Sequence, residues 1–116
     1  MSEGSIVTLD SSGLQLVAQV AVEKVGSREA QVIENELRAA APNRKWKIVI
    51  DLASVTLLAS MGLGMLVSLH KACAQNSGKL VICGLRPELL NLLKITHLER
   101  VLKIVPDKDA AVKALA

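Results

Sequence analysis

Residues 48–77 read IVIDLASVTLLASMGLGMLVSLHKACAQNS, and this stretch decides the fold. Its first five residues form an apolar run, interrupted only by Asp51 and rich in β-branched side chains, which is typical of a buried strand. Seven connecting residues follow, and from Ser60 onward the apolar residues recur with helical spacing. The stretch therefore predicts a strand, a crossover and a long helix. Ser60 is a candidate N-cap for that helix, and helix N-termini attract anions.

The residues before this stretch predict a β-hairpin and a helix. The hairpin joins residues 6–8 to residues 14–22 through the turn Asp10-Ser11-Ser12-Gly13. In its second strand Leu14, Leu16, Ala18, Val20 and Val22 are expected on the buried face, with Gln15 and Gln19 opposite. A helix is expected from Ser27 until just before Pro42, because the residue that precedes a proline disfavours helical geometry.

The residues after the central helix predict two further strand–helix units. Gly78 ends the central helix, and residues 79–83 form a second apolar strand. A helix starts at residues 85–87, a short strand spans 101–105, and a last helix spans 107–116. The chain is thus expected to be one α/β domain over residues 1–116, with a mixed, mostly parallel β-sheet and about four helices.

Composition excludes several classes of function. The chain has one aromatic residue, Trp46, and a net charge of +3 with basic residues scattered among acids, so no nucleic-acid partner is expected. Cys73 and Cys83 lack the paired spacing of a zinc site, and no metal or cofactor is expected. No secretory signal or membrane span is expected either, which favours a cytoplasmic protein.

The central motifs resemble a known family. Asp51-Leu52, Val55-Thr56 and Gly62-Leu63-Gly64 fit the pattern of the STAS domain of anti-sigma-factor antagonists, and the resemblance extends from about Val17 to Leu115. It implies a small cytoplasmic regulator without enzymatic activity. Its implied partner is an anti-sigma factor that is also a serine protein kinase of the histidine-kinase-like ATPase type.

The same resemblance implies a role for Ser60, which falls on the serine that the partner kinase phosphorylates in this family. The unmodified protein binds the kinase and frees the sigma factor, whereas the phosphoprotein does not bind. The sequence departs from the family pattern on both sides of Ser60. Ala59 replaces the family's acidic residue, and Met61 replaces a serine or alanine. Phosphorylation of Ser60 and a purely structural role as a helix cap therefore both stay open.

Asp10-Ser11-Ser12-Gly13-Leu14 spells the family's phosphorylation motif more faithfully than the residues around Ser60 do. No helix is expected after it, and Asp, Ser and Gly are ordinary hairpin-turn residues. We therefore interpret it as a turn.

The residues around Ser60 predict a surface that binds the partner. The first half of the helix is apolar on almost every side, so that the sheet would leave one face uncovered. Met61 and Met65 are expected to be exposed contacts, because methionine suits adaptable binding surfaces. The glycines Gly62 and Gly64 are expected to allow close backbone approach. The predicted partner-binding residues are Leu57, Leu58, Ala59, Met61, Gly62, Leu63 and Met65.

Two alternatives to this function remain. The chain could be an unphosphorylated STAS subunit that scaffolds another assembly, such as a signalling or lipid-transport complex, and Ala59 favours this alternative. A small α/β enzyme built around Asp51 at the end of a strand is disfavoured, because no catalytic partner is identifiable. The chain is expected to be a monomer or a weak dimer.

Overall fold

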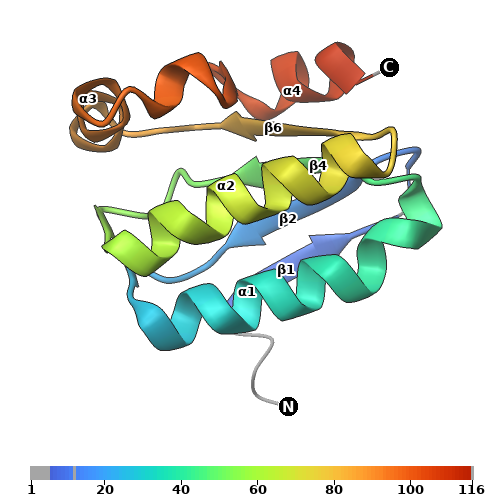
Figure 1. Cartoon of the computed structure of the whole chain (residues 1–116), viewed down its shortest axis with the longest axis horizontal. Helices are drawn as coiled ribbons and strands as arrows, with labels where there is room; N and C mark the ends of the chain where they lie inside the picture. Colours follow the sequence, from blue (N-terminus) through green and yellow to red (C-terminus); the bar gives the residue numbers. More distant parts are fainter. Residues whose placement is uncertain (1–5, 12, 116) are drawn as a thin grey trace.

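A five-stranded sheet forms the centre of the molecule in the computed structural model, which describes residues 6–11 and 13–115 (Figure 1). The strand order is β1-β2-β4-β6-β7. The β1–β2 pair is antiparallel and the other three pairs are parallel, so the sheet is mixed and mostly parallel as expected. The strands are β1 (Val7–Asp10), β2 (Leu16–Val20), β4 (Lys47–Asp51), β6 (Lys79–Cys83) and β7 (Lys103–Val105).

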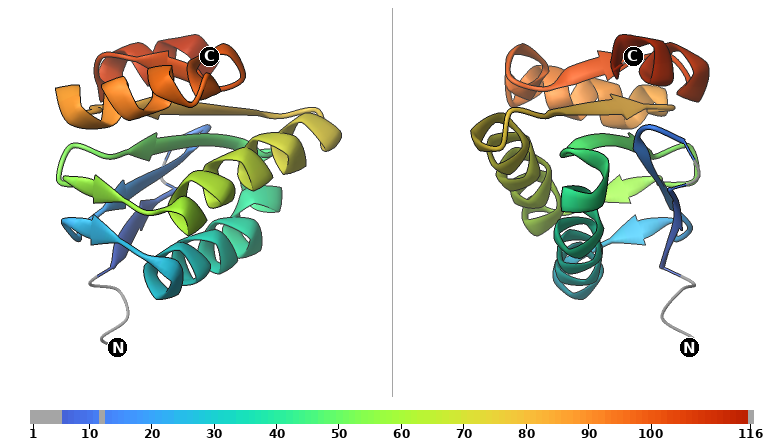
Figure 2. Two further views of the ribbon diagram at one scale, coloured as in Figure 1. Left: turned by 60° about the vertical axis from the view of Figure 1, so that its left-hand side comes forward. Right: turned by 90° about the vertical axis from the view of Figure 1, so that its right-hand side faces the viewer.

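Within the described residues four α-helices cover the sheet, and their number and order confirm the predicted α/β class. They are α1 (Ser27–Ala40), α2 (Ser60–Gln75), α3 (Pro87–Ile95) and α4 (Lys108–Leu115). Two 3-10 helices, η2 (Ala41–Arg44) and η3 (Leu98–Arg100), lie in the connections. Helices α1 and α2 lie side by side on one side of the sheet, and α4 lies on the other (Figure 2).

Strand β4 has buried residues on both faces, which is why its sequence does not alternate. Ile48 and Ile50 belong to the core beneath α1 and α2, whereas Val49 belongs to a second core beneath α4. All three are fully buried. A parallel strand with helices on both faces needs such a continuous apolar run.

A two-stranded parallel sheet was missed by the sequence patterns. It pairs β3 (Lys24–Val25) with β5 (Leu57–Leu58), and it lies beside the start of α2 (Figure 2). Each strand has two residues, which is too short for a periodic pattern to be visible.

The hairpin prediction is confirmed, but the predicted orientation of two residues in it is wrong. Leu14 is 78% exposed, while Gln15 is buried. Strand β2 begins only at Leu16, so the alternation does not extend back to Leu14. The Gln15 amide is partnered, since Nε2 donates to the carbonyl oxygen of Val112 at 3.5 Å.

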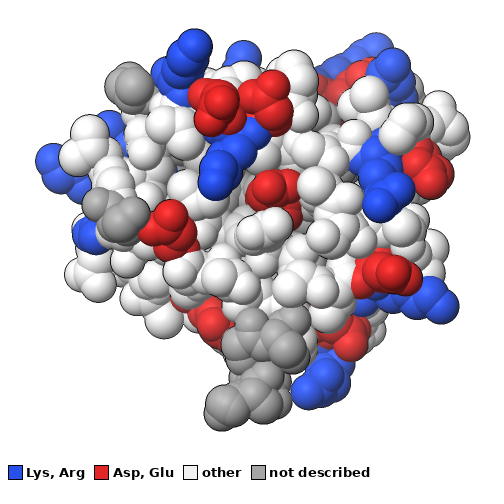
Figure 3. Space-filling view, turned by 180° about the vertical axis from the view of Figure 1, so that it is seen from behind, with Lys and Arg blue, Asp and Glu red and all other residues white. Residues whose placement is uncertain are grey.

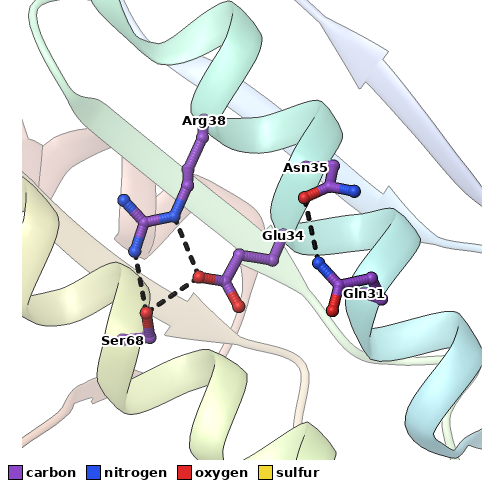
Figure 4. A network of polar contacts seen from close by, with 5 residues as sticks. All are labelled: Gln31, Glu34, Asn35, Arg38 and Ser68. Atoms are coloured by element: carbon purple, nitrogen blue, oxygen red, sulfur yellow. Dashed lines mark hydrogen bonds and ion pairs between the residues drawn. The ribbon is translucent and has the colours of Figure 1, made fainter.

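Helices α1 and α2 are also joined by a polar network (Figure 4). Ser68 of α2 donates its hydroxyl to Glu34 Oε2 of α1 at 2.8 Å. The same hydroxyl accepts from Arg38 Nη2 at 2.7 Å, and Arg38 Nε donates to Glu34 Oε2 at 2.9 Å. This network supplements the apolar contact between the two helices and links Ser68 of α2 to two residues one turn apart on α1.

Candidate functional site

Helix α2 begins at Ser60, but Ser60 is not its N-cap. The N-cap position is Ala59, whose backbone is extended, with φ −75° and ψ 172°. A cap must come from the residue before the first helical one, and alanine has no side-chain acceptor. The N-cap prediction for Ser60 is therefore wrong. Ser60 is exposed, and within the described chain its hydroxyl forms no hydrogen bond.

The segment that carries Ser60 is held by the small β3–β5 sheet. The N–H groups of Thr56 and Leu57 donate to the carbonyl oxygen of Glu23 at 2.8 and 3.1 Å. The Ala59 N–H donates to the carbonyl oxygen of Val25 at 3.0 Å. The residue immediately before Ser60 is thus fixed by a strand pair, and the serine is presented from an ordered backbone.

The beginning of the crossover is held by Asp51. Its Oδ1 accepts from the Ala53 N–H at 2.9 Å, and Arg86 Nε donates to the Ala53 carbonyl oxygen at 3.2 Å. Gly84 has φ 75°, and a Cβ there would lie 2.7 Å from Asp51 Oδ1. Two hollows, of about 580 and about 260 Å³, open elsewhere, and Asp51 lines neither. Asp51 therefore has a turn-forming role, and these contacts add nothing to the enzyme hypothesis.

Exposure divides the residues predicted to bind a partner. Leu57 is 55% and Met61 54% exposed, and Ala59 is also exposed. Leu63 is half-buried. These four residues and Ser60 form the surface that we call the Ser60 patch: Leu57, Ala59, Ser60, Met61 and Leu63.

The expected exposure of Met65 is wrong, since its side chain is 3% exposed. Leu58 at 4% exposure and Gly62 are buried as well. Met65 lies one turn beyond Met61, and there it packs in the same core as Val25 and Leu58. Because these three residues are buried, they have no surface that a partner could contact.

The two glycines of the helix have different surroundings. A Cβ on Gly62 would lie 2.7 Å from Leu58 Cδ1 and 3.3 Å from Val25 Cγ1, so the expected close approach is confirmed there. A Cβ on Gly64 would meet nothing within 4 Å, so the same expectation is wrong for Gly64. Gly62 is what brings the helix start against the β3–β5 pair.

The electrostatic surroundings of Ser60 favour an anion. The first turn of α2 has no acidic residue, and the sequence contains none between Asp51 and Glu88. In the described chain the N–H groups of Ser60 and Met61 donate to no acceptor. Unpaired N–H groups and the helix dipole stabilise negative charge at this position.

The remaining reactive side chains are not gathered into a site. Burial raises the pKa of Cys73 and of Cys83 to about 11, so both thiols stay protonated near neutral pH. Both are buried, which confirms Cys83 as a small core residue. Across the part of the chain that the structure describes, no group of three His, Cys, Asp or Glu residues could hold a metal ion. Nor is any described helix both long and apolar enough to cross a membrane.

The second serine motif lies in the predicted hairpin turn. Strand β1 ends at Asp10 and pairs with β2, and no helix follows. Ser12 lies outside the described residues. Ser11 is exposed, and its carbonyl oxygen accepts from Arg44 Nε at 2.9 Å.

The alternation of strands and helices, with an exposed serine at the start of α2, is a domain architecture that known proteins share. A sequence model of the STAS domain matches residues 25–111. The chain belongs to the STAS-domain family.

Three known proteins illustrate the similarity. BtrV of Bordetella bronchiseptica, assigned as an anti-sigma factor antagonist, is 28% identical over 90 residues, which are 78% of each chain. A Thermotoga maritima protein assigned the same role has a crystal structure with a TM-score of 0.82 at 17% identity, covering 99% of this chain and 98% of that one. The Bacillus cell-fate determinant SpoIIAA, in its phosphorylated form, matches with a TM-score of 0.72 at 11% identity, covering 93% and 98%.

Proposed function

We propose that this chain is an anti-sigma-factor antagonist that binds a kinase-type anti-sigma factor through the Ser60 patch. Ser60 is the proposed phosphoacceptor, and the role is that of a non-enzymatic regulator. The observation that carries the proposal is the exposed Ser60 hydroxyl in the first turn of α2, flanked by the exposed side chains of Leu57 and Met61. Family membership and the role assigned to BtrV support the same function.

The geometry supports phosphorylation as an off-switch. A phosphate adds about −2 charge, and the helix dipole with the unpaired N–H groups of Ser60 and Met61 would stabilise it. The domain would therefore stay folded. In a complex, however, the same dianion would be buried between apolar side chains, where desolvation opposes binding.

The first experiment tests the phosphoacceptor. The purified chain is incubated with Mg-ATP and, one at a time, the histidine-kinase-like serine kinases of the same genome, and its intact mass is measured. We expect one of them to add a single phosphate, which Ser60→Ala abolishes and Ser11→Ala leaves unchanged. Phosphate on the Ser60→Ala protein would refute the assignment.

The second experiment tests the Ser60 patch with the kinase identified in this way. Leu57→Ser and Met61→Ser each remove an exposed apolar contact, and we expect affinity to fall by about 10- to 100-fold. Leu14→Ser is the matched control, since Leu14 is also exposed but lies at the opposite end of the sheet. Equal losses in all three variants would contradict a localised patch.

A second candidate function is a STAS subunit that scaffolds another assembly without phosphorylation. The observation that favours it is Ala59 at the N-cap position, which leaves α2 without a side-chain cap where the family has an acidic residue. It predicts no added phosphate with any kinase of the genome, but retained binding of a partner through Leu57 and Met61.

A further inference from the structure

A basic hollow opens at the end of the sheet where β4 begins, away from the end that leads into Ser60. Its volume is about 260 Å³. The hairpin turn, η2 and the start of β4 contribute its walls. The lining residues are Gly13, Leu14, Asn43, Arg44, Lys45 and Lys47.

Positive charge in this hollow is not balanced. Among the described residues, Arg44, Lys45 and Lys47 line it and no carboxylate does. Lys79 adds a fourth cation, because it pairs directly with Lys47 in the β4–β6 register. Within residues 6–11 and 13–115, none of these four side chains forms an ion pair. Like charges directly opposite one another are destabilising. A bound anion would relieve this repulsion between the cations.

Residues 37–87, which supply η2 and β4 to the hollow, are poor in acids, whereas the hairpin on its other side carries Asp10 at the end of β1. Between Glu36 and Glu88 the only acidic residue is Asp51, which lies at the opposite end of β4. Basic side chains accordingly gather along the left margin of the rear face, where the parallel strands begin (Figure 3). The expectation that basic residues are scattered among acids does not hold at this end of the molecule.

The backbone that carries the cations is held in place. Lys45 and Trp46 both have left-handed φ, of 56° and 58°, which non-glycine residues seldom adopt. The Trp46 N–H donates to the Ala41 carbonyl oxygen at 3.0 Å, and the Trp46 carbonyl oxygen accepts from the Lys79 N–H at 2.9 Å. Arg44 is anchored too, since Nη1 donates to the Asn43 carbonyl oxygen at 2.8 Å. These contacts fix the Arg44 guanidinium and the backbone from which the lysine side chains extend.

We propose that this hollow binds a phosphate group. Guanidinium and ammonium groups form charge-assisted hydrogen bonds with phosphate oxygens, and the hollow has room for one such group. Leu14 is 78% exposed at its lip, next to Lys45 and Lys47. The phosphate can thus belong to a small soluble molecule or to an anionic lipid headgroup, whose bilayer would accept the Leu14 side chain.

The test is a titration of the ¹⁵N-labelled chain with inorganic pyrophosphate at constant ionic strength, followed by amide shifts. We expect saturable shifts confined to residues 13–14 and 43–47. The double variant Lys45→Asn/Lys47→Gln should bind about tenfold more weakly. Asparagine is chosen at position 45 because it tolerates a left-handed backbone.

The matched control removes two charges elsewhere, with Lys94→Gln and Arg100→Gln, both at exposed positions. It should retain the wild-type affinity. An equal loss in the control, shifts spread without saturation over the surface, or no shifts at all would overturn the proposal, because each means non-specific attraction or none.

Sedimentation with vesicles distinguishes the two sources of phosphate. Neutral phosphatidylcholine vesicles are compared with vesicles that also contain phosphatidylglycerol. Binding to the anionic vesicles alone, lost in both Leu14→Asn and the double lysine variant, assigns a lipid headgroup. Pyrophosphate binding without vesicle binding assigns a soluble phosphorylated ligand. Vesicle binding that survives the double lysine variant contradicts the site.

Discussion

Gly62 and Gly64 stand two residues apart in α2, yet a side chain would meet very different surroundings at the two positions. At Gly62 a Cβ would press on Leu58 and Val25, which are both buried and have little room to move. At Gly64 it would point into open space. The first glycine is therefore required by packing, whereas the second only weakens the helix.

This contrast yields a pair of stability predictions. Gly64→Ala should raise the free energy of unfolding by about 0.5–1 kcal/mol, through helix propensity alone. Gly62→Ala has the same propensity gain, but overpacking against Leu58 should leave it about 1 kcal/mol less stable than the wild type. Urea unfolding of the two variants measures both values. If Gly62→Ala were stabilising, Leu58 and Val25 of the β3–β5 pair would have to move aside for the added methyl group at little cost.

At the scale of elements, the contact between α1 and α2 combines an apolar core with one polar network. Ser68, Glu34 and Arg38 bond one another across the interface, and Glu34 and Arg38 also stand four residues apart along α1. The network is partly exposed, so its contribution is modest. We expect its geometry to help fix the position of α2, which begins with Ser60, along α1.

We predict that Ser68→Ala lowers the free energy of unfolding by about 0.5–1 kcal/mol, since the loss of two charge-assisted hydrogen bonds outweighs the gain in helix propensity. Gln31→Ala is the control, because Gln31 bonds only Asn35 of its own helix, at 3.1 Å, and should change stability by less than about 0.5 kcal/mol. A double-mutant cycle of Ser68→Ala with Arg38→Ala measures the coupling directly. A coupling near zero would exclude a role for the network in aligning the helices.

At the scale of the whole molecule, two cores lie on opposite faces of one sheet, and each contains a buried thiol. Cys73 belongs to the core beneath α1 and α2, and Cys83 to the core beneath α4. Burial raises the pKa of each thiol from 9.0 to about 11, and the carboxylates of Asp51 and Asp107 contribute at Cys83.

These thiols predict a loss of stability in alkaline solution. A folded-state pKa above the unfolded value means that the stabilisation is complete below about pH 9 and is lost as pH rises towards about 11. At pH 10.5 each thiol should lower the free energy of unfolding by about 1–2 kcal/mol relative to pH 8, because it ionises more readily in the unfolded chain. Urea unfolding at the two pH values tests this. For the Cys73→Ala/Cys83→Ala variant, the free energy of unfolding should fall less between the two pH values than it does for the wild type. An equal fall in the variant and the wild type would contradict the prediction.

The sequence by itself determined the order of the main strands and helices, because β-branched runs such as residues 48–50 and helical spacing after Ser60 are local consequences of which faces are buried. The motifs between Asp51 and Gly64 also indicated the family, which the match over residues 25–111 shows. Tertiary structure alone decided which apolar residues stay exposed: Met61 is exposed, whereas Met65 is buried in the core.

Tertiary structure likewise decided that Ala59, whose N–H donates to the Val25 carbonyl oxygen just after β5, occupies the N-cap position. Ser60 is therefore the first residue of the helix and exposed, and it does not cap the helix. Tertiary structure also brought Lys79 beside Lys47. These features depend on contacts between segments far apart in the chain, and such contacts leave no periodic pattern of residues in the sequence from which they could be predicted.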